Sequence, residues 1–317
     1  MTTSKTSYPK KPRVASSGDL VLDRRREWAV AATADGFHQA AAEIYEQILE
    51  RAPFWAIVWF ELGEAREKLG DRSGAIAAFE SAAARDPDGL LAADLRLAAL
   101  GAKQTPLAPA AAYVAGLFDQ YAAKFDHHLQ ETLEYRGPAL LRAAMERACE
   151  KLGRSFHFSR VLDLGCGTGL MGQEIRALCE WIEGVDLSPR MIEEARKTGV
   201  YDNLQTGEIV AFLAAQPAAA ADLVIAADVF VYLGDLAPVF AASAKAMAAG
   251  GFFAFSVQKT EAAEFIVGND MRYAHAPGYL NALAGAHGFQ TISLEDASTR
   301  KDRGEPVPGL VVVMRKT

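Results

Sequence analysis

The sequence predicts an α/β protein with a Rossmann-like, mainly parallel sheet of seven strands, preceded by a small all-helical domain. Two observations carry this prediction. From residue 159 onward, short apolar runs alternate with segments of helical spacing, which is typical of a parallel sheet covered by helices. Before residue 101, the chain matches itself after a shift of 34 residues, which is typical of stacked pairs of helices.

The composition is that of an ordinary globular protein, with 50% hydrophobic and 23% charged residues among 317. A formal charge of −7 gives no general attraction to nucleic acid or to anionic membranes, so we expect neither as a partner.

Three cysteines without C-x-x-C spacing indicate neither a zinc site nor a disulfide framework, and they favour a reducing cytoplasm. Residues 236–257 are apolar, but Pro238, Lys245 and a Gly-Gly pair favour a buried helix and strand over a membrane span.

Composition and pattern divide the chain into five segments. Residues 1–18 are basic, polar and interrupted by two prolines, so we expect a disordered tail and no secretory signal. The helical repeats occupy residues 19–100, and residues 101–110 have the composition of a linker. We expect residues 111–158 to form a helical lid and residues 159–317 to form the ligand-binding domain.

The repeat pairs small and aromatic residues at the offset of 34. The matched pairs are Ala29/Gly63, Gly36/Gly70, Ala41/Ala75, Tyr45/Phe79, Ile48/Ala82, Arg51/Arg85 and Pro53/Pro87. In the second copy, Gly63 and Ala75 allow two helices to approach closely, Phe79 fills the space beside them, and Pro87 ends the second helix. This pattern resembles the tetratricopeptide repeat, with residues 88–100 as a capping helix. Such an array would either dock a partner or stabilise the fold and its assembly, and the sequence leaves both open.

The second half contains one glycine-rich turn between a strand and a helix, in the segment VLDLGCGTGL. Gly165, Gly167 and Gly169 allow positive φ angles and let a ligand approach the backbone. The turn leads into a helix whose free N–H groups point back at it, so this segment predicts a small-molecule site at the carboxyl edge of the sheet. The expected strands are 160–164, 182–186, 202–204, 222–227, 250–257, 289–294 and 308–314.

The residues around this turn indicate the kind of ligand. The turn lacks the Gly-Lys-Ser/Thr of a phosphate-binding loop, and its G-x-G-x-G spacing differs from that of dinucleotide sites. Asp163, just ahead of the turn, repels a pyrophosphate and suits an ammonium group. Asp186 ends the second strand 21 residues after Gly165, where a carboxylate accepts both hydroxyls of an unphosphorylated ribose. An amino acid joined to a nucleoside meets both requirements, and S-adenosylmethionine (SAM) is such a molecule.

On the motifs VLDLGCGTG and VDLSPRMIEEA, residues 110–317 resemble the class I SAM-dependent methyltransferases. Together with the repeats, the whole chain resembles the bacterial methyltransferases that contain tetratricopeptide repeats. The resemblance implies that SAM is the cofactor, with S-adenosylhomocysteine (SAH) as product and no metal. The acceptor stays unidentified, as a small molecule or a protein. Two alternatives would fit the same motifs. One is an interaction protein whose SAM-binding domain senses the cofactor without catalysis, and the other is a different SAM-dependent reaction.

The resemblance also assigns cofactor contacts. Asp163 and the turn would hold the methionine end, Asp186 the ribose, and Glu208 the adenine amino group. Leu187 and Met191 would lie against the adenine. Met191 suits a core position equally well, and Glu208 also suits the first turn of a helix. The full set of expected cofactor residues is Tyr121, Asp163, Gly165, Cys166, Gly167, Asp186, Leu187, Met191, Glu208, Ile209 and Asp228.

Candidates for the chemistry follow the fourth and fifth strands. Asp228 follows the strand that ends nearest the transferable methyl group, and a general base is needed only if the acceptor arrives protonated. We expect a base among Asp228, Tyr232 and His275. Arg272, Tyr273 and His275 lie in what we expect to be a loop beside the acceptor, and these are our candidates for substrate binding.

Overall fold

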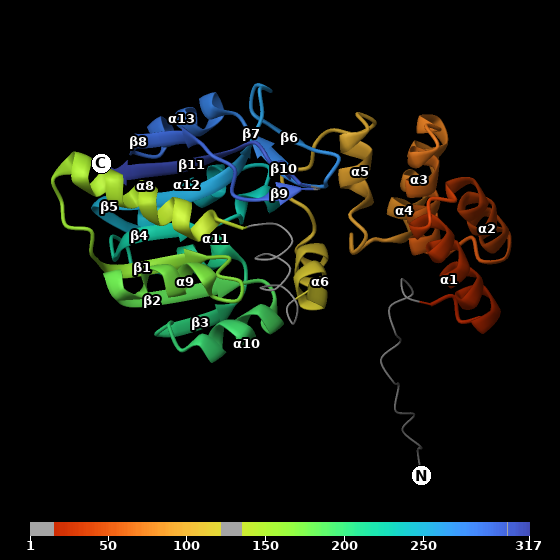
Figure 1. Cartoon of the computed structure of the whole chain (residues 1–317), viewed down its shortest axis with the longest axis horizontal. Helices are drawn as coiled ribbons and strands as arrows, with labels where there is room; N and C mark the ends of the chain where they lie inside the picture. Colours follow the sequence, from red (N-terminus) through yellow and green to blue (C-terminus); the bar gives the residue numbers. More distant parts are fainter. Residues whose placement is uncertain (1–15, 122–134, 303) are drawn as a thin grey trace, which may run out of the picture. The chain divides into compact units, whose positions relative to one another are not determined.

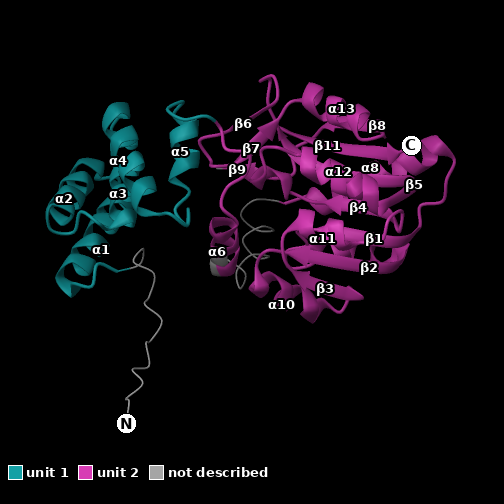
Figure 2. Ribbon diagram, turned by 180° about the vertical axis from the view of Figure 1, so that it is seen from behind, with its two compact units in different colours: residues 1–104 teal, residues 105–317 magenta. Residues whose placement is uncertain are grey.

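The structure is a computed structural model that describes residues 16–121, 135–302 and 304–317. It divides into two compact units, Met1–Gln104 and Thr105–Thr317, which are coloured separately in Figure 2. Most of the expected tail lies outside the described residues. The division falls inside the segment 101–110, where Leu107 O accepts hydrogen bonds from the backbone N–H groups of Gly234 and Asp235, both at 2.9 Å. The second half of that segment therefore belongs to the second unit.

The first unit is built from consecutive helices that pack on their neighbours. Tyr45, Trp55 and Phe79 are fully buried in it. A Cβ atom on Gly63 would lie 2.6 Å from Phe79 Cε1, so only glycine allows the close approach of the two helices here. Its helices are α1 (Leu20–Ala34), α2 (His38–Arg51), α3 (Ala56–Lys68), α4 (Arg72–Arg85) and α5 (Ala93–Ala99).

The second unit is an α/β domain around one large sheet, shown in Figure 1. Its strands are β1 (Phe158–Leu164), β2 (Cys179–Asp186), β3 (Asn203–Thr206), β4 (Ala221–Ala226), β5 (Met247–Lys259), β6 (Phe265–Val267), β7 (Tyr273–His275), β8 (Phe289–Asp296), β9 (Lys301–Asp302), β10 (Glu305–Pro306) and β11 (Gly309–Lys316). Its helices are α6 (Ala111–Tyr121), α8 (Gly137–Leu152), α9 (Leu170–Ile175), α10 (Pro189–Thr198), α11 (Ile209–Ala215), α12 (Ala237–Ala246) and α13 (Pro277–Ala286), with short 3₁₀ turns at Arg176–Leu178 and Phe230–Tyr232.

The main path of the sheet has the order β3-β2-β1-β4-β5-β11-β8. Strands β1 to β5 pair in parallel, whereas β11 is antiparallel to both β5 and β8. It follows that β8 runs in the same direction as β5, so its carboxyl end lies at the same edge of the sheet as the ends of β1, β2 and β4.

Side chains alternate between two core faces along each strand, as the period of two requires. Val161 and Phe252 pack with residues of α8 and α9 on one face. Leu162 and Phe253 pack with residues of α11, α12 and α13 on the other. Both faces of the central strands are thus covered, which is why these strands are apolar throughout. No helix among the described residues is long and apolar enough to cross a membrane.

The seven expected strands correspond to the seven strands of the main path, with ends that differ by a few residues. One expectation was wrong, because residues 273–275 are not a loop. They form β7, which pairs with β5 and with β6 and adds two short strands to the sheet.

Candidate functional site

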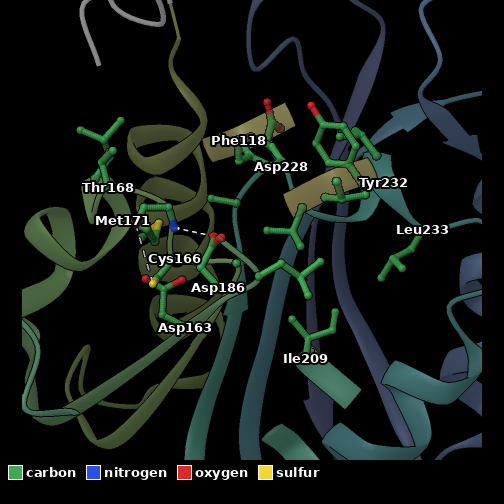
Figure 3. Close-up of a pocket in the computed structure, with 18 of the residues that line it drawn as sticks. Phe118, Asp163, Cys166, Thr168, Met171, Asp186, Ile209, Asp228, Tyr232 and Leu233 are labelled. Carbon is green, nitrogen blue, oxygen red and sulfur yellow. Dashed lines mark hydrogen bonds between the residues drawn. The ribbon is translucent and has the colours of Figure 1, made fainter. Parts of the chain in front are cut away.

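A cavity of about 320 Å³ opens at the carboxyl edge of the sheet, within the size range of small-molecule pockets. The ends of β1, β2 and β4 contribute its floor, and residues of α6 contribute to its wall. Figure 3 shows Asp163, Cys166 and Asp186 grouped at one end of this cavity, with Ile209 and Tyr232 lying away from them. Most of the residues singled out from the sequence therefore meet in one place.

The glycine turn adopts the geometry that its sequence predicts. Gly165, Gly167 and Gly169 all have positive φ angles, of 62°, 54° and 99°. A Cβ atom on Gly165 would lie 2.5 Å from Val229 Cγ2, so a side chain there would be both strained and obstructed. The bare backbone of Gly165 and Gly167 consequently lines the cavity.

Asp186 stands at the end of β2 and lines the same cavity. Its Oδ2 accepts a hydrogen bond from the Gly167 N–H at 3.0 Å, and its Oδ1 accepts one from the Ser188 N–H at 2.8 Å. Burial raises the pKa of this carboxyl group, and the two backbone N–H groups oppose that effect. Each carboxylate oxygen retains further acceptor capacity, so Asp186 can still receive two hydroxyl groups from a ligand.

Asp163, near the end of β1, lines the cavity but is only 1% exposed. Burial, together with the neighbouring charge of Asp186, raises its pKa to about 7, although the hydroxyl of Tyr201 donates to Asp163 Oδ2 at 2.7 Å. Near neutral pH this carboxyl group is therefore divided between its neutral and charged forms. A cationic ligand beside it would favour the charged form.

The remaining cofactor candidates occupy different environments. Cys166, Leu187, Glu208 and Ile209 all line the cavity, and Glu208 is also exposed to solvent. Met191 does not line it: the side chain is fully buried on α10, so the competing assignment of Met191 to the core is the one that fits.

Asp228 follows β4, lines the cavity, and has a left-handed backbone with φ of 56°. Its Oδ1 accepts from Ser256 Oγ at 2.8 Å, and its Oδ2 accepts from Thr299 Oγ1 at 3.0 Å and Arg300 Nη1 at 3.1 Å. Backbone strain of this kind persists only where surrounding contacts hold it, as Ser256 does here by also accepting the Asp228 N–H at 2.8 Å. Both carboxylate oxygens are engaged, so Asp228 is placed to position Arg300.

Tyr232 and Arg272 form another part of the wall. The Tyr232 ring packs edge-on against Phe118 of α6, with ring centroids 5.2 Å apart. The guanidinium of Arg272 lies 5.9 Å from the centre of the Tyr232 ring and also lines the cavity. An aromatic hydroxyl and a cation are thus available on the side of the cavity away from Asp163.

Two candidates are corrected, because Tyr273 and His275 lie on β7 in the core rather than at the cavity. Both are fully buried. The Tyr273 hydroxyl donates to Pro106 O at 3.0 Å, which attaches the start of the second unit to the sheet. His275 Nε2 lies 3.0 Å from Gly234 O, and burial lowers the pKa of this imidazole to about 4. A neutral, enclosed imidazole there cannot serve as a base in the cavity.

The expected lid is described in part. Val114 and Phe118 of α6 line the cavity, as does Tyr135 just before α8. Helix α6 ends at Tyr121, whose side chain lies outside the described structure.

The sequence reasoning missed Tyr135, Tyr201 and Arg300. Tyr201 follows α10 and reaches Asp163 across the fold, and nothing in its local sequence indicates that contact. Arg300 had a signal in the sequence, because it follows the expected strand 289–294. In a mainly parallel sheet, a residue just after a strand lies at the carboxyl edge, where the cavity is. Among the described residues, no group of three histidine, cysteine or acidic side chains is arranged to hold a metal ion.

Part of the chain that forms this cavity matches a known domain family. Residues 162–253 match the family model of a methyltransferase domain. The matched segment contains the glycine turn, Asp163, Asp186 and Asp228, but it ends before Arg272 and Arg300. The part of the cavity around the glycine turn therefore lies inside the family match, and the part that carries Arg272 and Arg300 lies outside it.

The individual relatives are similar over a part of their length. Methyltransferase-like protein 27 of Homo sapiens is 38% identical over 88 residues, which cover 27% of this chain and 34% of that protein. Malonyl-[acyl-carrier protein] O-methyltransferase of Erwinia pyrifoliae is 35% identical over 98 residues, covering 31% and 34% respectively. The chain thus spans about a third of the length of these two curated relatives. The crystal structure of the [4+2]-cyclase SpnF covers 67% of this chain and 99% of its own, with a TM-score of 0.53 at 15% identity, and so shares the fold.

Proposed function

We propose that this protein transfers a methyl group from SAM to an acceptor, with SAH as the product and no metal. The observation that carries the proposal is the position of Asp186. Its carboxylate lies beside the bare backbone of Gly167, at the tip of β2 and in the wall of the cavity. This arrangement suits a ribose, and it falls within the residues that match the methyltransferase domain.

The residues of the cavity would orient the cofactor. Asp186 would accept the ribose hydroxyls, and Asp163 would pair with the ammonium of the methionine end. Leu187 and Ile209 would contact the adenine, with Glu208 near its amino group. The sulfonium supplies a methyl group already activated for displacement, so the contribution of the protein is alignment and exclusion of water.

A base would be required only for an acceptor that arrives protonated. Tyr232 is our candidate, because it lines the cavity, whereas Asp228 already forms an ion pair with Arg300. Arg272, beside Tyr232, would contact the acceptor.

We further propose that the first unit is a tetratricopeptide-like array in a cytoplasmic protein. The offset of 34 residues, the succession of helices α1 to α5 and the contact of Gly63 with Phe79 support this assignment. Its role would be to dock the acceptor, or a protein that carries it, or to promote self-association.

The fold leaves a second candidate function open. SpnF, which has the same fold, is named a cyclase, so this fold does not by itself imply methyl transfer. The second candidate function is a repeat-based interaction protein whose second unit senses SAM without transferring its methyl group.

Two measurements test the proposal. Calorimetric titration with SAM and SAH tests binding, and no heat from either ligand at high protein concentration would reject both candidate functions. Incubation with methyl-labelled SAM and a cell lysate, followed by separation by size, then distinguishes an enzyme from a sensor. Label in the protein fraction would indicate a protein acceptor, label in the small-molecule fraction a metabolite, and binding without any transfer the sensor.

A further inference from the structure

Arg300 is a buried cation in the wall of the cavity. It lies in the connection 297–308 between β8 and β11, at the edge of the sheet where β1, β2 and β4 also end. It is only 4% exposed, yet it lines the cavity. Arginine is seldom buried without partners for its donors, so we expect each N–H group of this guanidinium to have an acceptor.

One edge of the Arg300 guanidinium is unsatisfied. Nη1 donates to Asp228 Oδ2 at 3.1 Å, but Nε and Nη2 have no hydrogen-bond partner in the part of the chain that the structure describes. Leaving buried donors unpaired costs free energy, and the cost is larger for charged groups. A ligand that supplied acceptors to this edge would remove that cost.

The chemistry of the free edge indicates which ligand group would do so. Nε and Nη2 point in roughly the same direction and bind the two oxygens of a carboxylate side by side. The chain uses this geometry elsewhere: Arg26 Nε donates to both oxygens of Glu61, at 2.9 and 3.1 Å, while its Nη2 donates to one of them. Asp228, in contrast, engages Arg300 only through Nη1 and leaves the edge available.

The charged side chains that line the cavity also separate by sign along the chain. Asp163 and Asp186 lie at the glycine turn, whereas Arg272 and Arg300 also line the cavity and follow later strands. A molecule with a negative group at Arg300 would therefore meet a cation, with Arg272 as a second cation in the same cavity.

We propose that Arg300 binds a carboxylate of a molecule held in this cavity through its Nε–Nη2 edge. The inference rests on the proposed function, because that function supplies two sources of the carboxylate: the methionine end of the cofactor, or the methyl acceptor. Asp228 is then a positioning residue, which holds the guanidinium in place from its other side.

The test is calorimetry on the full chain and its variants R300M and R300K, with R272M as the matched variant that removes another cavity cation. Three probes are titrated: SAH, 5′-methylthioadenosine, which lacks the amino-acid end, and malonate added to the SAH-saturated protein. Unchanged affinity for methylthioadenosine shows that the cavity of a variant is intact. If R300M is not folded, R300K, which keeps the charge, carries the test.

A cofactor carboxylate predicts that R300M and R300K bind SAH at least tenfold more weakly while methylthioadenosine binds as before. An acceptor carboxylate predicts unchanged SAH affinity and loss of malonate binding in both variants, with a smaller effect in R272M. The inference is overturned if SAH and malonate bind the variants as they bind the wild type, or if R300K keeps the full affinity for both. A wild type that binds neither adenosyl compound would instead refute the proposed function itself.

Discussion

The buried carboxyl group of Asp163 makes the stability of the second unit depend on pH in a way that can be calculated. Its pKa is about 7 in the folded protein, against a usual value of 3.8. Between these two values the folded state holds a proton that the unfolded chain releases. The stability from this proton is complete below pH 3.8 and is lost as the pH rises through about 7.

The magnitude follows from the size of the shift. Each pKa unit corresponds to about 1.36 kcal/mol, so a shift of roughly three units lowers the free energy of unfolding by about 4 kcal/mol over the whole range. Between pH 5 and pH 8, where the protein can be handled, the expected loss is about 3 kcal/mol. The variant Asp163→Asn keeps the shape of the side chain but cannot titrate, so we expect this loss to disappear from its profile.

The cysteines provide an assay that reports on this unit alone. Cys149, Cys166 and Cys179 are free and buried, and all three belong to residues 105–317. Pulse labelling of thiols in urea, with a disulfide reagent that reacts across this pH range, therefore measures unfolding of the second unit. The quantity compared is the difference in free energy of unfolding between Asp163→Asn and the wild type at each pH.

A control comes from Tyr201, whose hydroxyl donates to the Asp163 carboxylate. Because that hydrogen bond favours the charged form, Tyr201→Phe should raise the pKa of Asp163 further and move the loss of stability to higher pH. Parallel profiles for the wild type and Asp163→Asn between pH 5 and pH 8 would refute the reasoning, since they would mean that burial does not hold the proton on Asp163.

Three further predictions concern the cofactor site and the first unit. Asp186→Ala should weaken SAM binding at least tenfold by calorimetry, because two charge-assisted hydrogen bonds are lost, and an unchanged affinity would mean that the ribose is held elsewhere. Gly63→Ala should destabilise the first unit by about 1–3 kcal/mol in thermal or urea unfolding, because its Cβ would lie 2.6 Å from Phe79; equal stability would show that the helices can separate freely. Deletion of residues 1–100 should leave SAH affinity intact and abolish methyl transfer if the helical unit docks the acceptor, whereas loss of soluble protein would argue for a structural role.

The parts of the fold that could be predicted are those whose signal is long and local. Strands buried on both faces, such as 160–164 and 250–257, are apolar runs that stand out between helical segments. The pair β6 and β7 could not be found in the same way, since each has only three residues and shows no period. Because β7 was not predicted, His275 was placed in a loop beside the cavity. The sequence does not reveal that this histidine lies on a strand paired with β5 and β6.

The same distinction applies to the site. The positive φ angles of Gly165 and Gly167 and the position of Asp186 at a strand end follow from neighbouring residues, so the sequence predicts them. The hydrogen bond from Tyr201 to Asp163 and the ion pair of Arg300 with Asp228 join residues far apart in the chain, and only the folded structure brings them together.

The insertion of β11 between β5 and β8 has a practical consequence for redesign. The final strand, β11, is antiparallel to both neighbours, and the segment 297–308 connects β8 to it. These two strands hold the ends of the segment, and neither contributes to the glycine turn. Exchanging that hairpin between related chains, or randomising it in a library, would vary the wall that carries Arg300 and leave Asp163 and Asp186 untouched. The ligand preference of that wall could then be selected without changing the residues around the glycine turn.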